Sequence, residues 1–215
     1  MKCYEALPLN FRLYKEADFA GFSKENWIGV GISAVLLVAG VLLALGHPFS
    51  LLTETASSLK RLLYCLVLFA LIMLSVRVQE KLHGFLIYRI CGCPVEYNNS
   101  MGIYPCANSG HYFVEKKGWI LSSLLPVGIW CVLTLAATFL VTEKWFWAPY
   151  LLFLVSIAGV GGKLVGTFML ARSPKGSVVQ DNALTFKIYA PVDEVEAAEK
   201  AEAGEETETE PEAEE

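Results

Sequence analysis

Four long apolar stretches alternate with polar segments along the chain. They cover Ile28–Leu45, Leu62–Val76, Trp119–Thr142 and Trp145–Gly162, with lengths of 18, 15, 24 and 18 residues. A bilayer core of ~30 Å needs about 20 helical residues, so each stretch can span one with some help from its flanks. Backbone groups in lipid must be hydrogen-bonded within the segment, which favours helices over strands. The pattern therefore predicts four membrane-spanning helices.

The remaining segments complete the predicted fold. Residues 1–26 form a cytoplasmic lead-in of mixed charge, 27–192 the membrane domain, and 193–215 a tail. Two β-branched patches flank Asp181 and Asn182 and are typical of a small β-hairpin. The first apolar stretch follows 27 largely polar residues and lacks a cleavage site, so we expect it to be retained. The expected fold is an all-α membrane protein, a four-span helical bundle with a small cytoplasmic β-hairpin and a disordered acidic C-terminal tail.

Composition agrees with a membrane location, since 54% of residues are hydrophobic and the mean hydropathy is +0.46. The net charge of −5 is the sum of two parts of the chain with opposite charge. The segment 193–215 carries twelve acidic residues and one lysine, whereas the other 192 residues carry 16 Lys and Arg against 10 Asp and Glu. A segment so acidic and free of aromatic residues is typical of disorder. A structural or scaffold role, with the acidic tail engaging a basic protein partner, is one functional hypothesis.

Basic residues predict the orientation of the spans. Eleven Lys and Arg lie in the N-terminal segment, the central loop and the C-terminal segment, and only Lys60, Arg61 and Lys144 lie in the two alternate loops. The positive-inside rule places both termini and the central loop in the cytoplasm. On that side of the membrane thiols stay reduced, so we expect Cys3, Cys91, Cys93 and Cys106 to be free.

Ionisable residues inside spans are costly and mark candidate functional sites. Glu80 lies 18 residues after Leu62, and Lys163 lies 18 residues after Trp145. Both helices enter from the same face, so at ~1.5 Å per residue the two side chains reach similar depth. Two arrangements of Lys163 are therefore expected. Its ammonium can form an ion pair with Glu80, or it can snorkel to the lipid headgroups.

A second pattern overlaps Glu80. Gln79 and His83 are four residues apart and share a helix face. With histidine in place of Gln79, the sequence would read H-E-x-x-H, in which two histidines bind zinc and the glutamate activates the metal-bound water. An ordinary polar helix end, with Arg77 and Lys81 snorkelling to the interface, is the simpler interpretation.

The wider sequence resembles a family of small bacterial multi-pass membrane proteins of the zincin peptidase type, which carry H-E-x-x-H on a membrane helix. The matching pieces, in order over roughly residues 60 to 190, are "QEKLHGFLIY", "GIYPCANSGHYFVEKKGWILSSLLPVGI" and "GVGGKLVGTFMLARSPKGSVVQDNALTFKIYAP". The resemblance implies a bacterial plasma membrane protein with a peptide substrate or protein partner in the membrane.

Two residues depart from the family pattern. Gln79 stands at the first histidine ligand, and Lys163 stands at the aspartate that the family uses as a further ligand. Glu80 matches the base, and His83 matches the second histidine ligand. Without a metal, Glu80 would be an unpaired buried carboxylate, and the lysine ammonium can take over the charge role of the metal. We therefore expect a catalytically inactive member of the family without a cofactor.

Two further interpretations stay open. An active zinc peptidase could recruit Glu115 or His111 from the central loop as the missing ligand. Independently, a zinc site in the loop could use three thiolates and an imidazole, although paired zinc cysteines are usually separated by at least two residues. The candidate ligands of this loop site are Cys91, Cys93, Cys106 and His111. Nothing in the sequence resembles a phosphate-binding loop, a nucleophile–base arrangement or a nucleic-acid surface.

Overall fold

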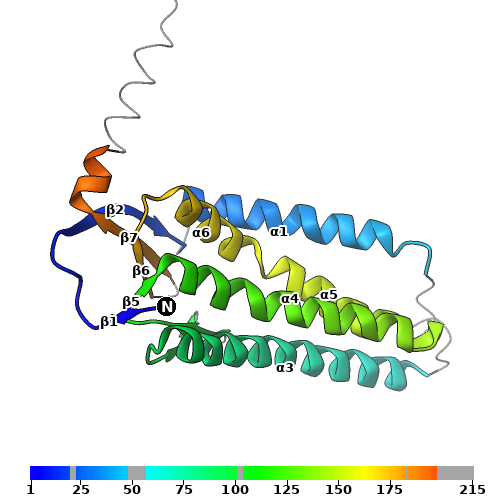
Figure 1. The fold of residues 1–215 in the computed structure, drawn as a ribbon. Coiled ribbons are helices and arrows are strands. Elements are labelled where there is room, and N and C mark those ends of the chain that lie inside the picture. The colour runs from blue at the N-terminus through cyan, green and yellow to red at the C-terminus, as the bar shows by residue number, and fades with distance from the viewer. Residues whose placement is uncertain (20–22, 48–56, 101–103, 183, 198–215) are drawn as a thin grey trace, which may run out of the picture.

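The computed structural model describes residues 1–19, 23–47, 57–100, 104–182 and 184–197. Four helical segments lie side by side, with a small sheet at one end (Figure 1). They are α1 (Lys24–Leu43), α3 (Ser58–Cys91), α4 (Lys116–Leu140), and a fourth made of α5 (Trp147–Ala158) and α6 (Gly161–Arg172). A short 3₁₀ turn, η1 (Glu143–Trp145), connects α4 to α5.

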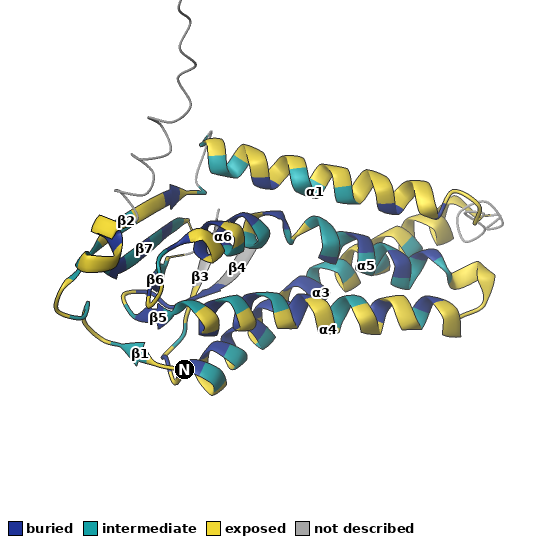
Figure 2. Cartoon of the chain, turned by 45° about the horizontal axis from the view of Figure 1, so that its top comes forward, coloured by how far each residue is buried: buried dark blue, intermediate teal, exposed yellow. Residues whose placement is uncertain are grey.

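These four segments are long and apolar enough to cross a membrane. Much of their apolar surface faces outward, and Figure 2 shows α1 exposed along nearly its whole length. Val35 and Leu43, for example, are 69% and 83% exposed. An apolar surface of this extent needs a cover of lipid or protein. The prediction of four helices with the composition of membrane spans is confirmed.

The second helix continues well past its apolar stretch. α3 includes the polar residues from Arg77 to His83 and ends at Cys91, where Gly92 adopts a left-handed conformation with φ of 71°. Glycine has no Cβ to oppose this conformation, which is why it commonly terminates helices. The extension carries polar side chains from the apolar part of α3 to the sheet.

The fourth segment is interrupted where the sequence predicts one continuous span. α5 ends at Ala158 and α6 begins at Gly161, with Gly159 and Val160 between them. A Cβ on Gly161 would collide with the carbonyl oxygen of Gly29, so α1 and α6 are in backbone contact at this point. The small residues thus pack α6 against α1, and the interruption ends three residues before Lys163.

The sheet at the end of the helices has five antiparallel strands in the order β1-β5-β6-β7-β2. The strands are β1 (Cys3–Tyr4), β2 (Phe11–Asp18), β5 (Phe113–Glu115), β6 (Val178–Asp181) and β7 (Thr185–Pro191). The predicted hairpin around Asp181 is present as β6 and β7. A separate two-stranded sheet pairs β3 (Glu96–Ser100) with β4 (Tyr104–Asn108).

The rest of this end was not predicted to be folded. The lead-in contributes β1 and β2 to the sheet, and the central loop contributes β3, β4 and β5. Residues 192–197 are helical, and Val195 is buried, so disorder does not begin at Asp193 as predicted. The remainder of the predicted tail, residues 198–215, lies outside the described residues.

The sheet and the helices share one core. Trp119 of α4, Leu170 of α6 and Ile87 of α3 pack against Val179 and Phe186 of the sheet. The Trp119 and Phe186 rings lie 4.7 Å apart between centroids. This packing fixes the sheet directly over the C-terminal ends of α3 and α6 and the N-terminal end of α4.

A disulfide joins Cys3 to Cys93, with the two Cα atoms 5.5 Å apart. It ties β1 to the segment that follows α3. The prediction that these two cysteines are free is wrong for this structure, because pairing of β1 with β5 brings positions 90 residues apart in sequence into contact. Cys91 is free and buried.

Candidate functional site

The polar residues of the extended α3 form a buried stripe. Ser75, Gln79 and His83 recur every four residues, and Glu80 lies beside them, so all four face the neighbouring helices. All four are buried, whereas Arg77 and Lys81 point outward and are exposed. The interpretation as a simple polar helix end thus holds for the two cations but is wrong for Gln79, Glu80 and His83.

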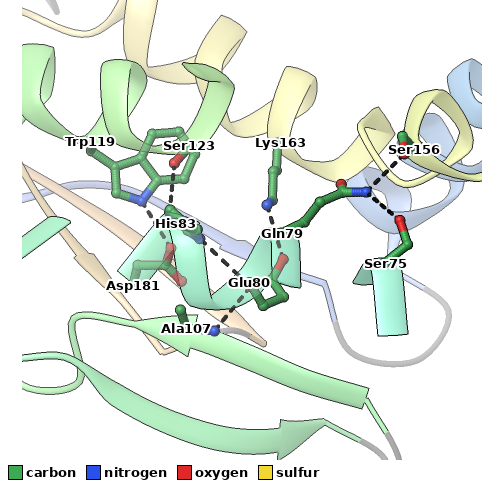
Figure 3. A network of polar contacts seen from close by, with 10 residues as sticks. All are labelled: Ser75, Gln79, Glu80, His83, Ala107, Trp119, Ser123, Ser156, Lys163 and Asp181. Carbon is green, nitrogen blue, oxygen red and sulfur yellow. Dashed lines mark hydrogen bonds and ion pairs between the residues drawn. The ribbon is translucent and has the colours of Figure 1, made fainter. Parts of the chain in front are cut away.

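Glu80 is the centre of the cluster in Figure 3. Its Oε1 lies 3.1 Å from Nζ of Lys163 in α6, and its Oε2 accepts a hydrogen bond of 3.0 Å from the backbone N–H of Ala107 in β4. Lys163 was expected either to pair with Glu80 or to snorkel, and the structure has the pair. One carboxylate therefore links three separate elements, α3, α6 and β4.

Gln79 turns away from this ion pair. Its Nε2 donates to Oγ of Ser156 in α5 at 2.8 Å and to Oγ of Ser75 at 3.3 Å (Figure 3). Gln79 and His83 share a helix face, yet the Gln79 amide is directed toward α5. The two positions that would be histidine ligands in an H-E-x-x-H motif do not converge here.

His83 contacts two oxygens. Its Nε2 lies 3.3 Å from Oγ of Ser123 in α4, and its Nδ1 lies 3.7 Å from Oε2 of Glu80. A proton on Nδ1 faces the carboxylate favourably, which leaves Nε2 to accept the Ser123 hydroxyl proton. The Nδ1–Oε2 distance exceeds a normal hydrogen bond, and Nδ1 is buried without a hydrogen-bond partner.

The connectivity from Ser123 through His83 to Glu80 is that of a nucleophile–base–acid triad. Nδ1 of His83 is not hydrogen-bonded to Glu80, however. A serine nucleophile must be activated by a base that a third group orients. We assign these contacts to the packing of α3 against α4.

A cavity of about 220 Å³ lies beside the cluster. Glu80, His83 and Lys163 line one part of it, and aromatic residues of the sheet end line another. Asp181 of β6 also lines it and accepts a hydrogen bond of 2.9 Å from the indole N–H of Trp119. The further lining residues are Phe19, Asn26, Ala107, Ser123, Gly159, Gly162 and Phe186.

The residues at this site do not fit a zinc ion. The Lys163 ammonium lies in contact with the carboxylate that would face the metal, and Gln79 is directed elsewhere. Among the residues that the structure describes, no group of three His, Cys, Asp or Glu is placed to hold a metal ion. Lysine ammonium has no lone pair with which to coordinate a metal, and its positive charge repels a divalent cation.

The two alternative metal sites are not assembled either. Glu115 lines a different surface pocket with Lys116 and Lys117, and His111 contacts Glu96, with 3.4 Å between Nδ1 and Oε1. Neither residue lines the cavity beside His83. The loop site of Cys91, Cys93, Cys106 and His111 lacks one ligand, because the sulfur of Cys93 is bonded to Cys3. The side chain of Cys106 lies outside the described residues.

Several residues of the site were not predicted as site residues. Ser123 and Ser156 lie within apolar stretches. An isolated serine in such a stretch usually donates a hydrogen bond to a backbone carbonyl of its own helix, so neither residue stood out as a site residue. Asp181 was interpreted as a turn residue, and Trp119 as the first residue of an apolar stretch. Only the fold brings Asp181 of β6 to the indole N–H of Trp119.

Comparison with known proteins gives no relative. No family model, no curated protein and no solved structure matches this chain.

Proposed function

We propose that this chain is a metal-free, catalytically inactive relative of the zincin-type membrane peptidases, which binds a peptide segment in its cavity without cleaving it. The observation that carries the proposal is the 3.1 Å contact between Nζ of Lys163 and Oε1 of Glu80. This contact joins the two positions at which the family resemblance expects the catalytic base and a metal ligand.

Charge balance supports the exchange of a metal for lysine. A carboxylate buried in a low-dielectric region is costly unless it is paired and hydrogen-bonded. Glu80 has both kinds of partner, an ammonium on one oxygen and the Ala107 N–H on the other. The site is therefore electrically satisfied without a metal ion, and no group remains to activate a water molecule as a metal would.

The lining of the cavity supports a peptide as its ligand. Lys163 and His83 offer hydrogen-bond donors, and Asp181 offers an acceptor on another wall. Trp119 and Phe186 add aromatic surface. An uncharged peptide unit carries one acceptor and one donor, so it can match both walls without adding charge to a cavity that already contains two carboxylates.

For the orientation in the membrane, we propose that the sheet and both chain ends are cytoplasmic. Eleven basic residues lie in the segments at the sheet end, counting Lys200 outside the described residues, against three at the other end. This asymmetry is the basis of the positive-inside rule.

The first test is elemental analysis of the purified protein in detergent, after growth with ample zinc. We expect wild type and His83→Ala to carry the same background of zinc, and chelator treatment to leave the melting temperature unchanged. Zinc near one per chain that is lost in His83→Ala would contradict the proposal and restore an active metallopeptidase. A variant lacking Cys91, Cys93 and Cys106 serves as the control for metal held by the loop.

The binding part of the proposal has a separate test. A photo-crosslinking amino acid at position 19, beside the cavity, should form peptide adducts in native membranes. The same amino acid at position 43, on the exposed end of α1, is the control. Equal adducts from both positions, or only lipid adducts from position 19, would overturn peptide binding while leaving the metal result untouched.

A further inference from the structure

A second hollow lies on the outside of the helices, between α1 and α6. It has a volume of about 700 Å³ and is distinct from the cavity at Glu80, with no lining residue in common. Its walls are mainly apolar side chains of the two helices, and three charged residues line its end near the sheet. The lining residues are Lys15, Lys24, Glu25, Ile28, Ile32, Leu164, Val165, Thr167, Phe168, Met169 and Ala171.

The groove follows the helix direction from a charged end to an apolar end. Lys24 begins α1, and Ile32 lies eight residues further along, which corresponds to about 12 Å at 1.5 Å per residue. Because α1 has the length and composition of a membrane span, the apolar part of the groove faces the hydrocarbon region. An occupant must therefore be apolar along most of its length and polar only at the end near the sheet.

The charged end of the groove is basic. Lys15 and Lys24 line it against the single carboxylate of Glu25, and the Arg172 guanidinium lies 4.1 Å from the ring centroid of Phe168. Lys24 also occupies the first turn of a 20-residue helix, where free backbone N–H groups favour anions. Two lysines against one carboxylate leave this end of the groove net positive, which matches a negatively charged headgroup.

A buried hydroxyl in the groove lacks a hydrogen-bond partner. Oγ1 of Thr167 is shielded from solvent, and it bonds to none of the described residues. Threonine in a membrane helix ordinarily donates to a carbonyl one turn earlier, and a hydroxyl without any acceptor in an apolar region is costly. Rotation of the Thr167 side chain about its Cα–Cβ bond would turn the hydroxyl toward the groove, where the ester carbonyl of a lipid would supply that acceptor.

We infer that the groove between α1 and α6 binds an anionic glycerophospholipid, with an acyl chain along Ile28, Ile32 and Phe168 and the phosphate at Lys15 and Lys24. The apolar walls select a lipid over a soluble phosphate, and the basic end selects an anionic headgroup. The unpartnered Thr167 hydroxyl places the ester region of the lipid between the apolar walls and the basic end of the groove.

The inference is tested by lipid retention in native mass spectrometry. The protein is purified from mixed vesicles of equal phosphatidylglycerol and phosphatidylcholine with identical acyl chains. We expect wild type to retain phosphatidylglycerol in preference, and Lys15→Gln with Lys24→Gln to lower that preference by about fivefold or more. Lys60→Gln makes the same change of charge at the far end of α3 and should leave the preference intact.

Thr167→Val tests the ester contact separately. It should lower retention of both lipids while keeping the preference between them, because both carry the same ester carbonyls. A wild type that retains both lipids equally would overturn the inference. So would a Lys60→Gln variant that loses as much preference as the double lysine variant, since the effect would then be one of overall charge.

Discussion

Gln79 and His83 lie one helical turn apart on α3, yet they bind different helices. Gln79 donates to Ser156 of α5, whereas Nε2 of His83 lies 3.3 Å from Oγ of Ser123 in α4. Between them, Glu80 pairs with Lys163 of α6. A stretch whose spacing resembles a metal-binding motif therefore acts as a polar junction that connects α3 to α4, α5 and α6.

The hydrogen bond between Gln79 and Ser156 should stabilise the contact between α3 and α5. Ser156→Ala is expected to lower the free energy of unfolding by roughly 0.5–1.5 kcal/mol, the usual order for a hydrogen bond between membrane helices. Titration with denaturing detergent measures it. Ser122→Ala is the matched control, because the hydrogen bond of this buried hydroxyl among the described residues is to Trp119 O of its own helix. If Ser156→Ala and Ser122→Ala lowered the free energy of unfolding equally, the proposed role of Gln79 in joining α3 to α5 would be contradicted.

Close packing of α1 against α6 depends on Gly161. In Gly161→Ala the new methyl group would meet backbone atoms of Gly29, so we expect a loss of about 1–3 kcal/mol in unfolding free energy. Gly162→Ala adds the same group to the next residue, where no atom lies within 4 Å. Thermal melting in detergent compares the two. If Gly162→Ala were as unstable as Gly161→Ala, the need for glycine at position 161 would come from backbone conformation and not from the contact with α1.

The proposed orientation predicts the behaviour of reporter fusions after residue 192. A fluorescent protein that matures only in the cytoplasm should be active there, and alkaline phosphatase should be inactive. The reverse pattern would contradict the cytoplasmic placement. It would also put the disulfide between Cys3 and Cys93 in an oxidising compartment, where disulfides normally persist.

Restoring the two missing ligands should bring back metal binding if the family resemblance is sound. The double variant Gln79→His with Lys163→Asp is expected to bind zinc near one per chain, measured by elemental analysis. Each single variant should stay at background, because Gln79→His keeps the competing ammonium and Lys163→Asp lacks the second imidazole. Adding His83→Ala to the double variant should abolish the binding. Zinc retained in that triple variant would place the metal elsewhere.

The helices were predictable from sequence because their signal is local. Four uncharged runs of adequate length define four spans, and equal depth along two helices indicates that Glu80 can reach Lys163. The interruption at Gly159 and Val160 was not predictable from sequence. Several glycines within an apolar run predict a continuous span whose small residues pack closely against a neighbouring helix. The interruption lies directly before Gly161, where the backbone approaches Gly29 of α1 closely.

The sheet was harder to predict for a different reason. β1 has two residues and β5 has three, too few to show an alternating pattern, and both depend on pairing with distant strands. β2 is at the sheet edge, with most of its residues partly or fully exposed, so its composition resembles a polar lead-in. The disulfide between Cys3 and Cys93 depends on the same long-range pairing. Within the five-stranded sheet, only the hairpin of β6 and β7, whose two strands are neighbours in sequence, was predictable.

The central claim, that the Lys163 ammonium replaces a metal in balancing Glu80, is tested most directly by a double-mutant cycle. Unfolding free energies are measured for wild type, Lys163→Ala, Glu80→Gln and the double variant. We expect Lys163→Ala to lose roughly 3 kcal/mol, as a buried ion pair does when one partner is removed. The double variant should recover much of that loss, because the carboxylate left unpaired is then neutral. If Lys163→Ala and the double variant had the same unfolding free energy, the claim would be contradicted.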